Sequence, residues 1–172
     1  MVGPDPRRRS LCLGLGLGAG LALSAAGLRA EDVAELDWRD LVPEGQTFVP
    51  PAIQGLLPHD ESAMASLQPP SSGVRTDWNG RIIRLSGFIV PLDFSGAGVT
   101  DFLLVPYVGA CIHVPPPPAN QIVLVTAQQP YDSGGLFEAI IVTGTFSTVS
   151  MSTELADVGY ALSAETITAF RA

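Results

Sequence analysis

RIIRLSGFIVPLDF, residues 81–94, is the stretch that decides the predicted fold. Its β-branched and aromatic residues are typical of a strand, and the Asn79-Gly80 pair before it is typical of a turn. Gly87 in the middle predicts a bulge or a sharp bend, and Pro91 predicts a sheet edge near the end. We therefore expect one strand that bends at Gly87.

Four further stretches with the same character follow, separated by turn-forming clusters. Gly144 lies inside one of them, as Gly87 does in the first, and such bends allow one strand to serve two faces of a barrel. We predict a mainly β domain over residues 77–172, a small closed or half-closed barrel of OB-like type. A small β-sandwich is the alternative, which periodicity cannot separate from it. The four stretches are DFLLVPYV (101–108), QIVLVT (121–126), LFEAIIVTGTFSTVS (136–150) and GYALSAETITAF (159–170).

Residues 31–76 are predicted to form an irregular, proline-rich arm. A short acidic helical turn is expected around Trp38, ended by Pro43, and residues Asp60 to Leu67 are predicted to form a short helix with Asp60 as its N-cap. We expect the arm to wrap the barrel rather than to form a core of its own. Its length without regular structure indicates a binding surface or a tether. The prolines that interrupt it are Pro50, Pro51, Pro58, Pro69 and Pro70.

The first 30 residues have the pattern of a signal peptide. Three arginines at positions 7–9 precede an apolar run over residues 11–27, and cleavage is expected after Ala30, with Ala26 as the alternative. Arg8-Arg9-Ser10-Leu11 also fits the twin-arginine export pattern, so both that route and the general secretory route stay open. An N-terminal membrane anchor is the competing interpretation. We expect an exported, periplasmic protein.

The net charge narrows the class of partners. Removal of residues 1–30 leaves 142 residues, enough for one domain with a real core. The chain has 9 basic and 17 acidic residues, and this removal takes four arginines and one aspartate from them. It leaves 5 basic and 16 acidic residues, a net charge of −11, and none of the basic residues is a lysine. Such a surface repels nucleic acid and anionic lipid and attracts cations or basic partners. The exported chain is not expected to span a membrane.

Cys111 is the one cysteine left after residue 30. Because exported proteins normally pair their cysteines, a single one is an intermolecular bridge, a buried thiol, a reactive thiol or a metal ligand. His113 follows two positions later, so in an extended strand over residues 110–114 both side chains would project on the same face and could share one Zn²⁺. Val114 precedes Pro115, which favours that extended conformation.

Two ligands do not make a tight zinc site, so others are needed. The candidates are His59 in the arm and the carboxylates Asp93, Asp101 and Glu138, which lie in strands or at strand ends. The prolines 115–118 are expected to form a stiff rod, either as a plain connector or as a device that holds the site in place. The rod is Pro115, Pro116, Pro117 and Pro118, and Tyr107, Asn120 and Gln121 are the residues expected to support or orient the ligands.

A rival chemistry is a Cys-His nucleophile, with His113 as the base for Cys111 and Asn120 or a carboxylate orienting it. Neither a Gly-rich loop nor a helix N-terminus is evident as an anion hole for such a reaction. The sequence also contains no nucleotide-binding loop, no HExxH helix and no GxSxG elbow. It thus favours a binding protein over an enzyme.

Three stretches of the sequence resemble the signature of a bacterial family of small exported proteins, the DUF3299 family. They are GRIIRLSGFIVPLDF, VTDFLLVPYVGACIHVPPPPANQIV and, upstream of both, LDWRDLVP. The resemblance covers most of the chain after residue 30 and implies a mainly β, exported protein. Some members are encoded beside ABC-transporter components linked to zinc uptake. The resemblance therefore implies an accessory role in metal homeostasis, carried onto Cys111 and His113, and implies no specific biochemical activity.

Three interpretations of function are open. The first is a periplasmic zinc-binding accessory that works with ABC-transporter components, and it predicts bound zinc. The second is a metal-free docking module for a transporter or envelope partner. It predicts that changes at Pro116 and Tyr107 matter while Cys111→Ser does not. The third is a thiol enzyme with a titratable, alkylation-sensitive Cys111.

Overall fold

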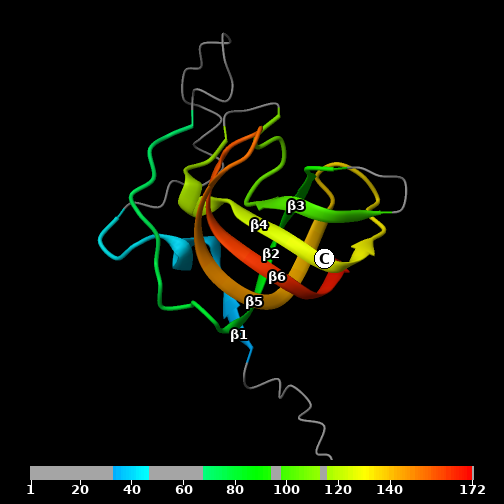
Figure 1. Cartoon of the computed structure of the whole chain (residues 1–172), viewed down its shortest axis with the longest axis horizontal. Coiled ribbons are helices and arrows are strands. Elements are labelled where there is room, and N and C mark those ends of the chain that lie inside the picture. The colour runs from blue at the N-terminus through cyan, green and yellow to red at the C-terminus, as the bar shows by residue number, and fades with distance from the viewer. Residues whose placement is uncertain (1–32, 47–67, 94–97, 113–115, 172) are drawn as a thin grey trace, which may run out of the picture.

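The computed structural model describes residues 33–46, 68–93, 98–112 and 116–171 (Figure 1). The predicted signal peptide and the predicted helix Asp60 to Leu67 lie outside these residues. Within them the chain forms six strands and two short 3₁₀ helices. The elements are β1 (Ala34–Leu36), η2 (Trp38–Leu41), β2 (Ile82–Pro91), β3 (Val99–Val105), η4 (Ala119–Gln121), β4 (Val123–Tyr131), β5 (Ala139–Ser152) and β6 (Asp157–Ala169).

The strands form one sheet in the order β1-β2-β3-β4-β6-β5, with an additional pairing between β2 and β5. The pairings therefore run from β2 through β3, β4, β6 and β5 back to β2, a partial ring that we call the strand ring (Figure 1). β1–β2 and β4–β6 are parallel, and the other pairs are antiparallel. The mainly β prediction is confirmed, and a single sheet of this kind is not the two-sheet sandwich named as the alternative.

Gly87 marks the point where β2 changes partner. β2 pairs with β5 from Ile82 to Phe88 and with β3 from Phe88 to Pro91. A Cβ atom at Gly87 would lie 2.8 Å from the carbonyl oxygen of Val105, closer than real Cβ atoms come. A glycine is needed here because the neighbouring strand passes directly over the bend.

Gly144 lies in the part of β5 that pairs with β2 on one side and with β6 on the other. The register against β6 shifts between Thr143 and Gly144. A Cβ atom at Gly144 would lie 2.9 Å from the Cα atom of Ala164, so the two backbones approach too closely for a side chain. Both mid-strand glycines predicted as bends therefore lie where a neighbouring backbone comes too close for a side chain.

Two apolar clusters fill the structure. The larger one includes Phe102 and Leu104 of β3, and the smaller one includes Leu103 and Val105 of the same strand. Because successive side chains of a strand point to opposite faces, β3 is buried on both faces. The smaller cluster, which we call the outer cluster, consists of Val90, Leu103, Val105, Ala110, Cys111, Ile122, Ala156 and Val158.

The described part of the arm is fastened to the ring through η2. Trp38 and Leu41 are buried in the larger cluster. Three backbone carbonyls of η2 accept hydrogen bonds from side chains that are distant in sequence. The carbonyl of Trp38 accepts from Gln121 Nε2 (2.8 Å), the carbonyl of Asp40 from Trp78 Nε1 (3.3 Å) and the carbonyl of Leu41 from Tyr160 OH (2.6 Å). The helical turn expected around Trp38 is thus present, and β1 before it was not predicted.

Candidate functional site

Cys111 lies in a turn after β3, not in a strand. Its φ is +68°, in the left-handed region, and the N–H of Ile112 donates to the carbonyl of Gly109 at 3.3 Å. The expected extension over residues 110–114 is therefore wrong at Cys111, and strand alternation does not place its side chain beside that of His113. His113 itself lies outside the described residues, as do His59 and Pro115.

The thiol of Cys111 is buried, with 7% of the residue exposed, among the apolar side chains of the outer cluster. Burial raises the pKa of the thiol to about 12, because a thiolate would lose its hydration there. The pKa of Tyr107 is also raised, first by burial and then by the charge that Cys111 would carry. In this setting the thiol is protonated at neutral pH, which is the state of an inert structural cysteine.

The three predicted carboxylate ligands come from three different segments, after β2, in β3 and before β5. Asp93 is exposed after the end of β2. Asp101 accepts hydrogen bonds from Thr126 at 3.1 Å and from Thr100 at 3.0 Å. Among the described residues, no three His, Cys, Asp or Glu side chains form a group that could hold a metal ion. Because both histidines lie outside that part of the chain, the zinc site stays a prediction.

Glu138 orders the loop before β5. Its carboxylate accepts hydrogen bonds from Tyr131 OH (3.0 Å), Ser133 Oγ (3.2 Å) and the N–H of Gly134 (2.7 Å). Burial, and after it the hydrogen bond to Glu138, raises the pKa of Tyr131 to about 12. Glu138 is thus held by donors from the end of β4 and from its own loop, which accounts for this carboxylate without a metal.

Asn120 and Gln121, expected to orient a ligand, fasten the arm to η4. Asn120 Nδ2 donates to Ser72 Oγ (3.0 Å) and to the carbonyl of Gly73 (2.9 Å), and Gln121 Nε2 donates to the carbonyls of Trp38 and Asn120. Gln121 Oε1 is buried, and among the described residues no donor reaches it. The two amides therefore hold chain segments together that are distant in sequence.

The described prolines of the rod are packed against the protein. Pro116 and Pro117 are buried and Pro118 is half-buried. The carbonyl of Pro117 accepts a hydrogen bond from Gln68 Nε2 at 2.9 Å, and that of Pro118 accepts one from the N–H of Gln121 at 2.7 Å. The described prolines thus lead into η4 as a packed segment, and the choice between a plain connector and a device that holds a site stays a prediction.

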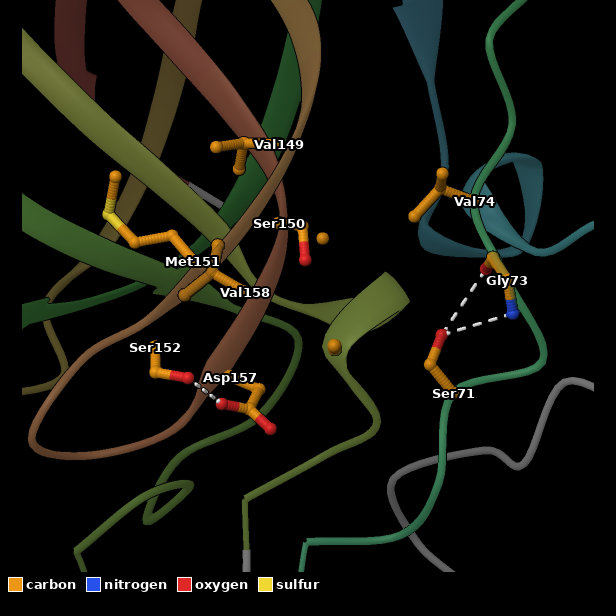
Figure 2. Close-up of a pocket in the computed structure, with 11 residues that line it drawn as sticks. Ser71, Gly73, Val74, Val149, Ser150, Met151, Ser152, Asp157 and Val158 are labelled. Carbon is orange, nitrogen blue, oxygen red and sulfur yellow. Dashed lines mark hydrogen bonds between the residues drawn. The ribbon is translucent and has the colours of Figure 1, made fainter.

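A hollow of about 400 Å³ lies between the segment 71–74 and the hairpin of β5 and β6 (Figure 2). We call it the hairpin hollow. Figure 2 shows Ser71, Gly73 and Val74 on one side and the hairpin residues, among them Met151 and Val158, on the other. The lining residues are Ser71, Gly73, Val74, Ala119, Val149, Ser150, Met151, Ser152, Asp157, Val158 and Gly159.

A bulge in β5 shapes the hairpin hollow. Thr148 pairs with Tyr160 and Met151 with Val158, so the two residues between them in β5 oppose the single residue Gly159 in β6. A Cβ atom at Gly159 would lie 2.8 Å from the carbonyl oxygen of Ala119, so a larger residue would displace η4. The bulge brings its two residues, Val149 and Ser150, into the lining.

The other wall of the hairpin hollow is fixed by side-chain hydrogen bonds. Gln68 Nε2 donates to the carbonyl of Asp157 at 2.9 Å, and Gln68 Oε1 accepts from the N–H of Asp157 at 2.8 Å. Asn120 holds Ser72 and Gly73 in the same way. The segment 68–74 is thereby attached to the hairpin and to η4, so hydrogen bonds within the chain shape the hollow.

The chemistry of the hairpin hollow is apolar with acceptor groups around it. Val74 and Met151 are 39% and 45% exposed, while Val158 is buried. Ser152 donates to the carboxylate of Asp157, and Ser71 Oγ is bonded to the backbone of its own turn. The lining contains one acidic residue and no basic one. It suits an apolar side chain flanked by hydrogen-bond donors or a positive charge.

Sequence reasoning missed this hollow because its two walls are 75 or more residues apart in the chain. The one local signal was Gly159 at the start of a predicted strand, since a glycine there indicates a close backbone approach.

In the described residues there is no helix with the length and apolar character of a membrane span.

The comparisons with known proteins agree with the fold. The model of a family described as "Protein of unknown function (DUF3299)" matches residues 38–169. A crystal structure of a DUF3299 family protein from Pseudomonas aeruginosa PAO1 is similar, with 39% sequence identity and a TM-score of 0.67. The similarity covers 80% of this chain and 96% of that one. Among curated proteins, none matches the chain.

Proposed function

The chain belongs to the DUF3299 family, and from its geometry we propose that it is an exported binding module that docks a segment of a partner protein in the hairpin hollow. The observation that carries the proposal is that the hollow is preformed. A bulge, a glycine and the Gln68 and Asn120 clamps shape it without a ligand. Preformed sites bind more tightly because less ordering is needed on binding.

The size and lining of the hollow agree with this role. Ligand sites in proteins commonly enclose about 300–1,000 Å³, and the hairpin hollow holds about 400 Å³. Burying one apolar side chain of a partner against Val74 and Met151 would contribute about 1.5–3 kcal/mol. The serine hydroxyls and the Asp157 carboxylate would accept donors that flank that side chain.

The place of action and the class of partner rest on the sequence. The signal-peptide pattern of residues 1–30 supports export to the periplasm, and the net charge of −11 after its removal supports a basic partner surface. The resemblance of the sequence block to family members that are encoded beside ABC-transporter components supports a transporter component as that partner.

Photo-crosslinking in cells tests the docking proposal. A photoreactive residue replaces Met151 in the hollow or, as the matched control, Thr145, which is exposed on the same strand outside it. We expect one defined adduct from position 151 and none from 145, and we expect Val74→Asp to abolish it. Equal labelling from both positions, or an adduct that Val74→Asp leaves unchanged, would contradict docking in the hollow.

Zinc binding is the second candidate function. The observation in its favour is that Cys111, the one cysteine after the signal-peptide pattern, precedes His113 by two residues. Zinc would have to displace the proton of the buried thiol, which makes binding pH-dependent and couples it to local rearrangement. Cys111 and His113 would hold the ion, with His59 as a further ligand.

Elemental analysis of the untagged protein after exposure to zinc and a weak chelator decides between the two candidates. Near-stoichiometric zinc that is lost in both Cys111→Ser and His113→Ala would support the metal site. Metal-free protein of unchanged stability, with crosslinking from position 151 intact, would leave the docking module alone. The same samples test thiol catalysis, because that interpretation requires rapid alkylation of Cys111 in the folded protein.

A further inference from the structure

The strand ring is incomplete between β4 and β6. Their parallel pairing runs from Val123 and Tyr160 to Ala127 and Ala164, where it stops. β6 continues to Ala169 and stays paired with β5 on its other side. Among the described residues, the edge of β6 from Glu165 to Ala169 has no strand partner on the side of β4.

β4 leaves β6 because it bulges at this point. Thr126 pairs with Asp101 of β3 and Tyr131 with Val99, so four residues of β4 stand against the single residue Thr100. Such an excess bends a strand away from its neighbours. A hollow of about 410 Å³ lies between the bulged segment and β6, and we call it the strand gap. Its lining residues are Ala127, Gln128, Gln129, Pro130, Tyr131, Ala164, Glu165, Thr166, Ile167 and Thr168.

The strand gap reaches the interior of the ring. Tyr131 and Ile167, which line it, are partly buried and pack against the larger apolar cluster. Ala127 and Ala164, the last paired residues, belong to that cluster. A strand in the gap would therefore find both an open row of backbone groups and apolar side chains to cover.

The edge of β6 lacks the usual protection against pairing. Proteins guard free strand edges with lysine, proline, charges or bulges. β6 contains neither proline nor lysine, and the whole chain is without lysine. The edge is protected only at Glu165, by the charge of this residue and by a bulge. Glu165 is an extra residue between the Thr143–Thr166 and Gly144–Ala164 pairs. The four residues after Glu165 form a continuous edge.

We infer that the strand gap is a strand-addition site, where an extended basic peptide segment of a partner protein pairs with β6 and completes the ring. Main-chain hydrogen bonds to Ile167 and Ala169 would supply the affinity, as in other proteins that bind peptides by adding a strand. These two residues face the gap, because the N–H of Phe170 donates to Ala139 of β5 and alternate residues of an antiparallel pair point to the same side. The charge follows from the lining, which carries one acidic side chain, Glu165, and no basic one. The site is separate from the hairpin hollow and does not depend on it.

A tethered strand tests this inference without knowledge of the natural partner. The full chain is extended after Ala172 by a Gly-Ser linker of about eight residues and then Lys-Val-Lys-Val-Lys, which gives a millimolar effective concentration. Matched controls carry Glu-Val-Glu-Val-Glu, or the Lys strand with proline in place of both valines. Amide hydrogen exchange of residues 165–169 is the readout, with Leu103 in β3 as the reference for global stability.

We expect the Lys strand to slow exchange at the gap-facing amides of Ile167 and Ala169 by about tenfold relative to the proline control, with Leu103 unchanged. The Glu strand should protect them less, and Glu165→Gln should reduce the difference between the Lys and Glu strands. Equal exchange with the Lys strand and the proline control would overturn strand addition. Protection by the Glu strand that equals or exceeds that of the Lys strand would overturn the basic character of the partner.

Discussion

Replacing Tyr160 with phenylalanine measures how firmly the arm is attached to the ring. Tyr160 is buried in β6, and its ring stacks on that of Phe146 with centroids 5.0 Å apart. Its hydroxyl donates to the carbonyl of Leu41 at 2.6 Å and accepts from the N–H of Arg75 at 2.7 Å. The substitution keeps the ring and removes one group that bonds both described parts of the arm.

The expected loss follows from those two hydrogen bonds. Each contributes about 1 kcal/mol net, and a buried carbonyl left without a donor costs about 1–3 kcal/mol. The Leu41 carbonyl would lose its donor in a buried setting, while the Arg75 N–H is only part-buried and can turn to water. We therefore expect Tyr160→Phe to lower the free energy of unfolding by about 2–3 kcal/mol, and the melting temperature by about 6–9 °C.

Urea denaturation provides the assay. The two tryptophans, Trp38 and Trp78, lie at the contact of the arm with the ring, so their fluorescence follows the arm while far-ultraviolet circular dichroism follows the sheet. Tyr131→Phe is the matched control, because its hydroxyl donates to Glu138 within a loop. A loss below about 0.5 kcal/mol, or one no larger than that of the control, would refute the reasoning about the attachment.

Three further predictions concern the ring. The free energy of unfolding should fall as pH rises above about 10, because burial raises the pKa of Tyr160, so this hydroxyl ionises first in the unfolded chain. Urea titrations at pH 8–11, roughly the range around the ordinary pKa of tyrosine, should show a smaller fall for Tyr160→Phe. Gly144→Ala should lower the free energy of unfolding by about 2 kcal/mol or more in the same titration, since its Cβ would push against the β6 backbone. Gly80→Ala is the comparison, because its Cβ would meet open space and only the positive φ would cause strain. Cys111 should react with a maleimide at least about 100-fold more slowly in the folded protein than in urea, and comparable rates would contradict its burial.

The strands were predictable because their local composition agrees with the tertiary structure. β5 was predicted at residues 136–150 and lies at Ala139–Ser152, and β6 was predicted at 159–170 and lies at Asp157–Ala169. Gly87 and Gly144 could be interpreted as bends because a glycine inside a β-branched stretch has few other uses. Residues 128–131 fall between the predicted strands 121–126 and 136–150 because they are polar and include Pro130, yet they belong to β4, which bulges over residues 127–130.

The site was less predictable because distant contacts decide it. The predicted extension rested on Val114 before Pro115, while Gly109, a turn-forming residue just before Ala110 and Cys111, was not considered, and the chain turns at Cys111. Asn120 and Gln121 next to a Cys-His pair indicated ligand support, but their partners are 47–83 residues away in the arm. No local pattern encodes such partners, since a buried amide has the same sequence signature whether it holds a ligand or a backbone carbonyl.

Both hollows lie where β6 loses a regular neighbour, and the closure of the ring explains why. Five strands close on themselves only with strong bends, and bulges supply the bends. One bulge, in β5 opposite Gly159, opens the hairpin hollow at the start of β6, and the other, in β4 after Thr126, opens the strand gap at its end. The parallel ladder between β4 and β6 spans only five pairs between them. The residues that close the ring therefore also form the two hollows where we propose that partner chains bind, one through side-chain burial and one through backbone pairing.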